Sequence, residues 1–116
     1  MRRFIQSFLY AFGGLTYVWR EERNFRIQTV VALFVLVGMF FLDFSLNSMG
    51  LIVVAVTLVL TAEVINTAFE DTLNKIEPNK DATVGRIKDI AAGVVVLCVF
   101  AAIIIGFFIF LSYFSL

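Results

Sequence analysis

Long stretches without a charged residue constrain this chain more than any other feature of its sequence. Residues 44–62 and 90–116 contain no Asp, Glu, Lys or Arg, and residues 27–42 are apolar apart from Gln28 and Thr29. About 20 apolar residues in a helix are enough to span the ~30 Å hydrocarbon layer of a membrane. The hydrophobic content of 61% exceeds the roughly 45–50% of soluble domains. The sequence therefore predicts an all-α integral membrane protein.

The uncharged stretches divide the chain into a single domain with three membrane-spanning helices. We expect these helices at about residues 27–46, 49–70 and 90–114, with a short turn over 43–50 and a polar loop over 71–88. Residues 1–20 are more polar and contain a Gly-Gly pair, so they do not suit a span. Their aromatic residues recur every three or four positions, with arginines off that stripe, which predicts an amphipathic helix on the membrane surface.

The distribution of basic residues predicts the orientation of the helices. All nine Lys and Arg lie within residues 2–26 and 75–88, so both groups belong on the cytoplasmic side of the membrane. The N-terminus is then inside and the C-terminus outside. Because the basic residues flank apolar segments and form no separate groove, nucleic acid is not expected as a partner.

A group of polar side chains ends the second apolar stretch. Glu63, Asn66 and Glu70 are spaced i, i+3 and i+7, which places them on one face of a helix. Carboxylates this deep in an apolar helix are costly, so a functional role is the default interpretation. Two other interpretations remain open from these residues alone. The carboxylates can belong to a structural polar network, or Glu63 can bind a proton or cation in a small transporter or assembly subunit.

The surrounding residue types narrow the chemistry. The chain has no His, which excludes imidazole metal ligands, and no phosphate-binding Gly-x-x-x-x-Gly-Lys loop. Carboxylate oxygens suit Mg²⁺, which usually also binds substrate phosphates, and nearby lysine and arginine suit phosphate itself. A carboxylate that takes up a proton, a magnesium site and basic residues are what phosphoryl transfer to a membrane-embedded hydroxyl requires.

These residues also carry a family resemblance. The pattern Glu63-x-x-Asn66-Thr67-Ala68-x-Glu70, followed by Gly85-Arg86-x-Lys88-Asp89, resembles the prokaryotic diacylglycerol kinase family, which includes undecaprenol kinases. The resemblance covers nearly the whole chain. It implies an ATP-dependent lipid kinase of a bacterial cell (inner or plasma) membrane. It also implies a homotrimer, with active sites shared between neighbouring subunits near the cytoplasmic surface.

The resemblance assigns roles to single residues. Glu63 matches the catalytic base, with Asn66 beside it. Glu22 and Glu70 match the residues that hold Mg²⁺ together with the phosphates of ATP. Further nucleotide-contacting positions are matched by the following residues: Arg3, Tyr10, Lys88 and Asp89.

This sequence departs from the family pattern in the polar loop. Asn74 stands where the family usually has Asp, and residues 79–81 replace an acidic residue and a His. Nucleotide contacts made by the loop are therefore in doubt, and an inactive member of the family remains an alternative. The resemblance also leaves the acceptor open between diacylglycerol and undecaprenol, with a slight preference for undecaprenol from residues 66–68 and 91–93.

Overall fold

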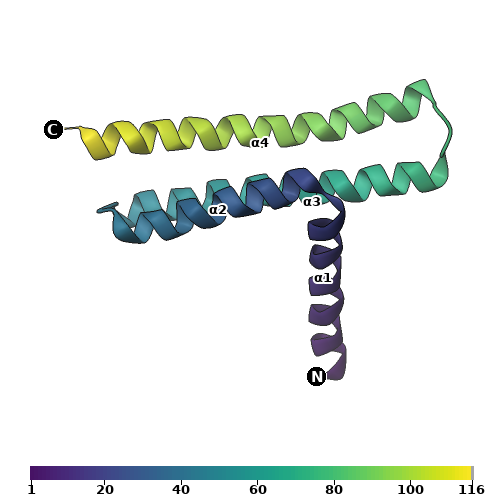
Figure 1. Cartoon of the computed structure of the whole chain (residues 1–116), viewed down its shortest axis with the longest axis horizontal. Helices are drawn as coiled ribbons and strands as arrows, with labels where there is room; N and C mark the ends of the chain where they lie inside the picture. The colour runs from purple at the N-terminus through teal and green to yellow at the C-terminus, as the bar shows by residue number, and fades with distance from the viewer. Residues whose placement is uncertain (116) are drawn as a thin grey trace.

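The computed structural model describes residues 1–115 and consists of four α-helices. Their bounds are α1 Arg2–Glu21, α2 Arg23–Phe41, α3 Leu46–Ile76 and α4 Ala82–Phe114. Helices α2, α3 and α4 run side by side along the long axis of the molecule, whereas α1 lies crosswise to them (Figure 1). Each of these three helices, α2, α3 and α4, is long and apolar enough to cross a membrane, as the sequence predicts.

Helix α2 and its neighbours differ in length from the expected spans. Helix α2 begins at Arg23 and reaches 19 residues by Phe41, which is ~28 Å, so it does not need the residues up to 46. Residues 42–45 form the connection instead, and α3 begins at Leu46. Ser45 caps α3, because its hydroxyl accepts a hydrogen bond from the backbone N–H of Ser48 at 3.2 Å. The expected turn over 43–50 is correspondingly shorter.

The polar segment between α3 and α4 is mostly helical. Helix α3 continues to Ile76 and α4 starts at Ala82, which leaves residues 77–81 as the connection. Asp81 caps α4 by accepting a hydrogen bond from the N–H of Val84 at 2.9 Å, and Glu77 accepts one from the N–H of Asn79 at 3.1 Å. Lysine and arginine are good helix formers, and with Lys75, Arg86 and Lys88 the helices α3 and α4 extend past the start of α2 (Figure 1).

Helix α1 is continuous through Gly13 and Gly14, although each glycine costs about 1 kcal/mol relative to Ala in a helix. Both glycines keep negative φ, so neither interrupts the hydrogen bonding. Helix α1 ends at Glu21, and Glu22 is a single extended residue between α1 and α2 (φ −112°, ψ 107°). We call residues 21–23 the elbow.

The hydrophobic core is small and lies toward the end of the bundle away from α1. Met39, Ile52 and Ile109 are buried there, one from each long helix. Most other large apolar side chains are exposed, including Phe34 at 75% and Phe107 at 57%. Such a surface is unfavourable in water and is suited to lipid or to further helices.

Candidate active site

Glu63 is the most buried carboxylate of the described chain, with only 4% of its surface exposed. It lies on α3 where the apolar part of that helix ends. Thr67, one turn further on, is 2% exposed and donates its hydroxyl to the backbone carbonyl of Glu63 at 3.0 Å. The side-chain amide of Gln28 on α2 lies beside the Glu63 carboxylate. The site is therefore built where α2 and α3 pack against each other.

Two further carboxylates lie near Glu63. Glu70 follows two turns later on α3, and Glu22 approaches from the elbow. Burial raises the pKa of Glu22 above its usual range, and the negative charges of Glu70 and Glu63 raise it further. Such an effect requires these groups to be close in space. The structure thus brings Glu22 near the two glutamates of α3, although Glu63 and Glu70 follow it by 41 and 48 residues in the sequence.

These carboxylates suit a magnesium ion only in combination with substrate phosphates. Within residues 1–115, no group of three or more Asp, Glu, His or Cys side chains is placed to hold a metal ion by itself. Mg²⁺ usually binds through one or two carboxylates plus waters and phosphate oxygens. Glu22 and Glu70 offer oxygen ligands of the right chemistry for this arrangement.

The electrostatic repulsion at Glu22 predicts a change in stability. Because the pKa of Glu22 is raised in the folded state, its charged form is less favourable there than in the unfolded chain. We expect Glu22→Gln to raise the melting temperature of the protein in chelator by about 2 °C at pH 7. The gain should shrink as the pH falls through the raised pKa, and adding Mg²⁺ should stabilise the wild type more than the variant. Thermal unfolding in detergent measures all three effects.

Lys88 is the basic residue that the structure brings to the polar end of α3. It lies on α4, is half-buried, and donates a hydrogen bond from its Nζ to Oδ1 of Asn74, one turn beyond Glu70. Its ammonium group is therefore held toward α3 rather than toward open solvent. Because Asn74 is neutral, it orients Lys88 without forming an ion pair with it.

Of the other expected site residues, Asn66 lies near the carboxylates, whereas Asp89, Arg3 and Tyr10 do not. Asn66 is half-buried on α3 next to the site, but Asp89 is exposed and lines a separate depression near the start of α4. Arg3 and Tyr10 lie along α1, ~28 Å and ~18 Å from Glu22 at about 1.5 Å per residue. Both are exposed, and α1 leads away from the bundle (Figure 1). A single chain thus does not bring these two residues to Glu63.

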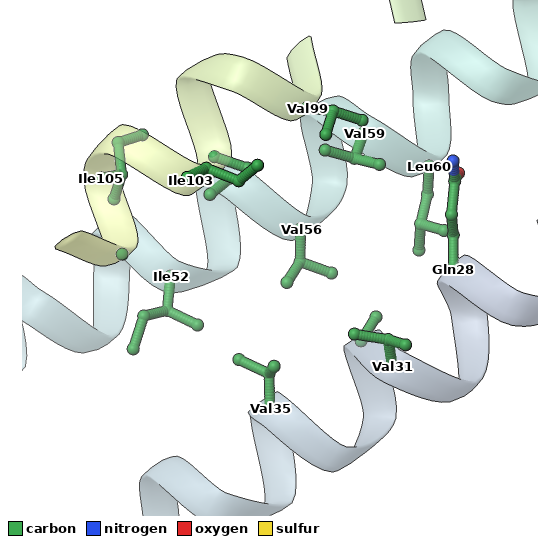
Figure 2. A pocket seen from close by; sticks show the side chains of 14 residues that line it. Gln28, Val31, Val35, Ile52, Val56, Val59, Leu60, Val99, Ile103 and Ile105 are labelled. Atoms are coloured by element: carbon green, nitrogen blue, oxygen red, sulfur yellow. The ribbon is translucent and has the colours of Figure 1, made fainter. Parts of the chain in front are cut away.

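A largely apolar cavity of about 330 Å³ lies between α2, α3 and α4. Gln28 is at one end of it, next to Leu60, and aliphatic side chains such as Val31 and Val35 line the rest (Figure 2). The amide oxygen of Gln28 is buried and has no hydrogen-bond partner among residues 1–115. The sequence pattern marks Gln28 as a polar exception in an apolar stretch, but it does not show that this residue adjoins Glu63.

The comparisons with known proteins decide the class of protein. A family model described as prokaryotic diacylglycerol kinase matches residues 9–110. The chain belongs to the prokaryotic diacylglycerol kinase family. It is similar to a protein named undecaprenol kinase from Bacillus subtilis, with 36% identity over 96% of this chain and 90% of that protein. It is also similar to two proteins named diacylglycerol kinase. The one from Synechocystis is 33% identical over 86% of this chain and 58% of that protein. The one from Escherichia coli is 29% identical over 88% of this chain and 84% of that protein.

Membership of this family confirms the resemblance seen in the sequence. The chain is a lipid kinase with three helices able to span a bacterial membrane. The interpretation of Glu63 as the ion site of a small transporter is thereby set aside. The roles of single residues at the carboxylates remain predictions.

Proposed function

We propose that this kinase transfers the γ-phosphoryl group of ATP to the hydroxyl of a membrane lipid alcohol, with Glu63 as general base. Glu63 takes the proton of the lipid hydroxyl as its oxygen bonds to the γ-phosphorus. The bond from the γ-phosphorus to the β,γ-bridging oxygen breaks, and ADP leaves with that oxygen. The products are a lipid monophosphate and ADP, and the proton is later released from Glu63 to solvent.

The burial of Glu63 is the observation that carries this proposal. A carboxylate with 4% exposure at the end of an apolar span is shielded from water, as a general base next to a membrane-embedded hydroxyl would be. The cavity that ends at Gln28 supports the same conclusion, because its aliphatic walls suit a hydrocarbon chain. A lipid in that cavity presents its hydroxyl beside Gln28 and hence near Glu63.

Glu22 and Glu70 are the proposed ligands for Mg²⁺. When bound with ATP, Mg²⁺ neutralises phosphate charge that develops during transfer. The closeness of these carboxylates to each other, and their mutual repulsion without a cation, support the assignment. Asn66 lies on the same helix face as Glu63 and Glu70, and its proposed role is to orient a reacting oxygen by hydrogen bonding.

Lys88 is the proposed contact to the phosphates of ATP. We expect Lys88→Met to raise KM for ATP about tenfold or more, because a hydrogen bond to a charged group contributes about 1.5–3 kcal/mol. The matched control is Lys75→Met, which removes an exposed lysine next to Asn74 and should leave KM near the wild-type value. Steady-state assays at varied ATP concentration measure both. If KM for ATP rises equally in the two variants, Lys88 makes no specific contact with ATP and is one of several positive charges at the membrane surface.

The acceptor is proposed to be undecaprenol rather than diacylglycerol. Residues 66–68 and 91–93 are slightly closer to the undecaprenol-kinase pattern, and the similarity to the Bacillus subtilis protein points the same way. The test uses purified protein in mixed micelles with Mg·ATP and each lipid in turn. A larger kcat/KM for undecaprenol supports the proposal, and a larger value for diacylglycerol reverses the choice of acceptor. If neither lipid is phosphorylated, the proposed function is wrong.

The site is proposed to face the cytoplasm and to be part of a homotrimer. The cytoplasmic side is proposed from the basic residues, which all lie within residues 2–26 and 75–88, on α1, at the start of α2, and in or beside the connection between α3 and α4. A stripe of small and hydroxyl residues on α3 supports self-association: Gly50, Thr57, Thr61 and Ala68 are all exposed within one chain. Residues of this kind are typical of helix–helix interfaces in membranes. The molecular mass of the detergent-solubilised protein tests this assembly.

A further inference from the structure

Helix α1 is held to the rest of the molecule by few contacts. Val18 is its buried residue, at 6% exposure. Arg26 of α2 donates hydrogen bonds from Nη1 to the carbonyl oxygens of Trp19 and Arg20, both at 2.8 Å. These carbonyl groups lie in the last turn of α1, where they lack partners within the helix. These contacts fix the end of α1 at the elbow. They leave open the angle at which α1 crosses α3.

One side-chain hydrogen bond joins α1 directly to α3. The hydroxyl of Tyr17 donates to Oδ2 of Asp71 at 3.1 Å, although 54 residues separate the two. Neither residue was singled out for this role by the sequence pattern. The bond lies outside the apolar part of α3, where Asp71 is exposed. The pKa of Tyr17 is raised by this hydrogen bond, so the hydroxyl keeps its proton and remains a donor at neutral and mildly alkaline pH.

The position of this bond relates it to the carboxylates. Asp71 directly follows Glu70 on α3, and Tyr17 precedes Glu22 by little more than one helical turn. The bond therefore bridges the two segments that carry the proposed magnesium ligands. Since Glu22 is a single extended residue between two helices, rotation at the elbow would move its carboxylate relative to Glu70. A link between α1 and α3 on this side opposes that rotation.

We propose that the Tyr17–Asp71 hydrogen bond is a strut that fixes α1 against α3 and thereby sets the spacing of Glu22 and Glu70 for Mg·ATP. Tyr17 is a positioning residue, since it acts through Glu22 and touches no reacting atom. The inference rests on the proposed function for its effect on catalysis. The strut itself is a property of the fold and can be measured without any substrate.

The test compares variants that break the bond with variants that keep it. Tyr17→Phe removes only the hydroxyl, and Asp71→Ala removes the acceptor from the other side. Asp71→Asn removes the charge but keeps a carbonyl oxygen that can accept the bond. Tyr113→Phe is the matched control, because Tyr113 lies near the far end of α4 and loses the same hydroxyl.

Two readouts distinguish the strut from general stability. The first is KM for Mg·ATP, which should rise about threefold to tenfold in Tyr17→Phe and Asp71→Ala, the range expected for one lost hydrogen bond, with kcat within about twofold of wild type. The second is the fluorescence anisotropy of Trp19, the single tryptophan, which lies on α1 two residues from Tyr17. Anisotropy should fall in both variants because α1 gains freedom of motion.

The double variant Tyr17→Phe/Asp71→Ala should show no more effect than either single variant, because both remove one interaction. Asp71→Asn and Tyr113→Phe should match the wild type. The strut is overturned by additive effects, by unchanged Trp19 anisotropy in Tyr17→Phe and Asp71→Ala, or by a fall in thermal stability with KM unchanged. If the wild type phosphorylates no lipid while both variants lower the anisotropy, the strut stands and the proposed function fails.

Discussion

Replacement of Glu63 with Gln is expected to lower kcat for lipid phosphorylation by about 10²–10⁴-fold, the usual contribution of a general base. Gln has nearly the same shape and can keep contact with Gln28, but it cannot accept the proton of the lipid hydroxyl. The backbone contact from Thr67 is unaffected, since it uses the carbonyl of residue 63. The loss should therefore appear in kcat while the protein remains folded. Initial rates in mixed micelles measure it.

Asp43→Asn is the matched control for this loss. Asp43 lies at the opposite end of the bundle, in the connection between α2 and α3, and its replacement also exchanges a carboxylate for an amide. Activity of that variant should remain within about twofold of wild type, as for a surface substitution of at most ~0.5 kcal/mol. If the Glu63→Gln variant phosphorylates lipid as fast as the wild type, Glu63 is not the general base.

The second large effect concerns the magnesium dependence of the reaction. Glu22→Gln and Glu70→Gln should each raise the Mg²⁺ concentration for half-maximal activity at least about tenfold, which requires only ~1.4 kcal/mol of lost attraction to a divalent cation. The pKa of Glu22 is raised, so its carboxylate is protonated at a higher pH than an isolated Glu. The Mg²⁺ requirement of the wild type should consequently rise as the pH is lowered, and less so in Glu22→Gln.

Glu21→Gln provides the control for the magnesium experiment. Glu21 is the neighbouring carboxylate in the elbow and is exposed, whereas Glu22 is half-buried. Glu21→Gln removes the same charge from the elbow as Glu22→Gln does. If Glu22 is a specific metal ligand, the Mg²⁺ concentration for half-maximal activity should rise much less in Glu21→Gln than in Glu22→Gln. Equal shifts in both variants would mean that the elbow contributes only general negative charge.

The sequence predicts the helical architecture well because apolar length and charge decide it. Three helices able to span the membrane lie where uncharged stretches lie, and α1 follows the residues expected for a separate N-terminal helix. Helix ends were less predictable. Caps at Ser45 and Asp81 and the continuation of α3 to Ile76 depend on local hydrogen bonds and on helix propensity outside the membrane, which hydropathy does not report.

The site is predictable along one helix but not between helices. The spacing of Glu63, Asn66 and Glu70 places them on one face, whereas the approach of Glu22 depends on the elbow and on the packing of α2 against α3. Residues alone did not distinguish Glu22 from Glu21, and the family resemblance did. The partners Gln28 and Asp71 emerge only from tertiary contacts, since nothing in their sequence positions relates them to Glu63 or Tyr17.

The division of roles among the three carboxylates is the central claim, and single-turnover transfer measured beside equilibrium binding of Mg·ATP tests it most directly. Purified wild type, Glu63→Gln and Glu70→Gln are each mixed with ATP labelled at the γ-phosphate and excess lipid alcohol. We expect Glu63→Gln to bind Mg·ATP with wild-type affinity and to transfer no label on the wild-type timescale, and Glu70→Gln to lose affinity. Transfer at the wild-type rate by Glu63→Gln, or equal loss of Mg·ATP binding in both variants, would contradict the account.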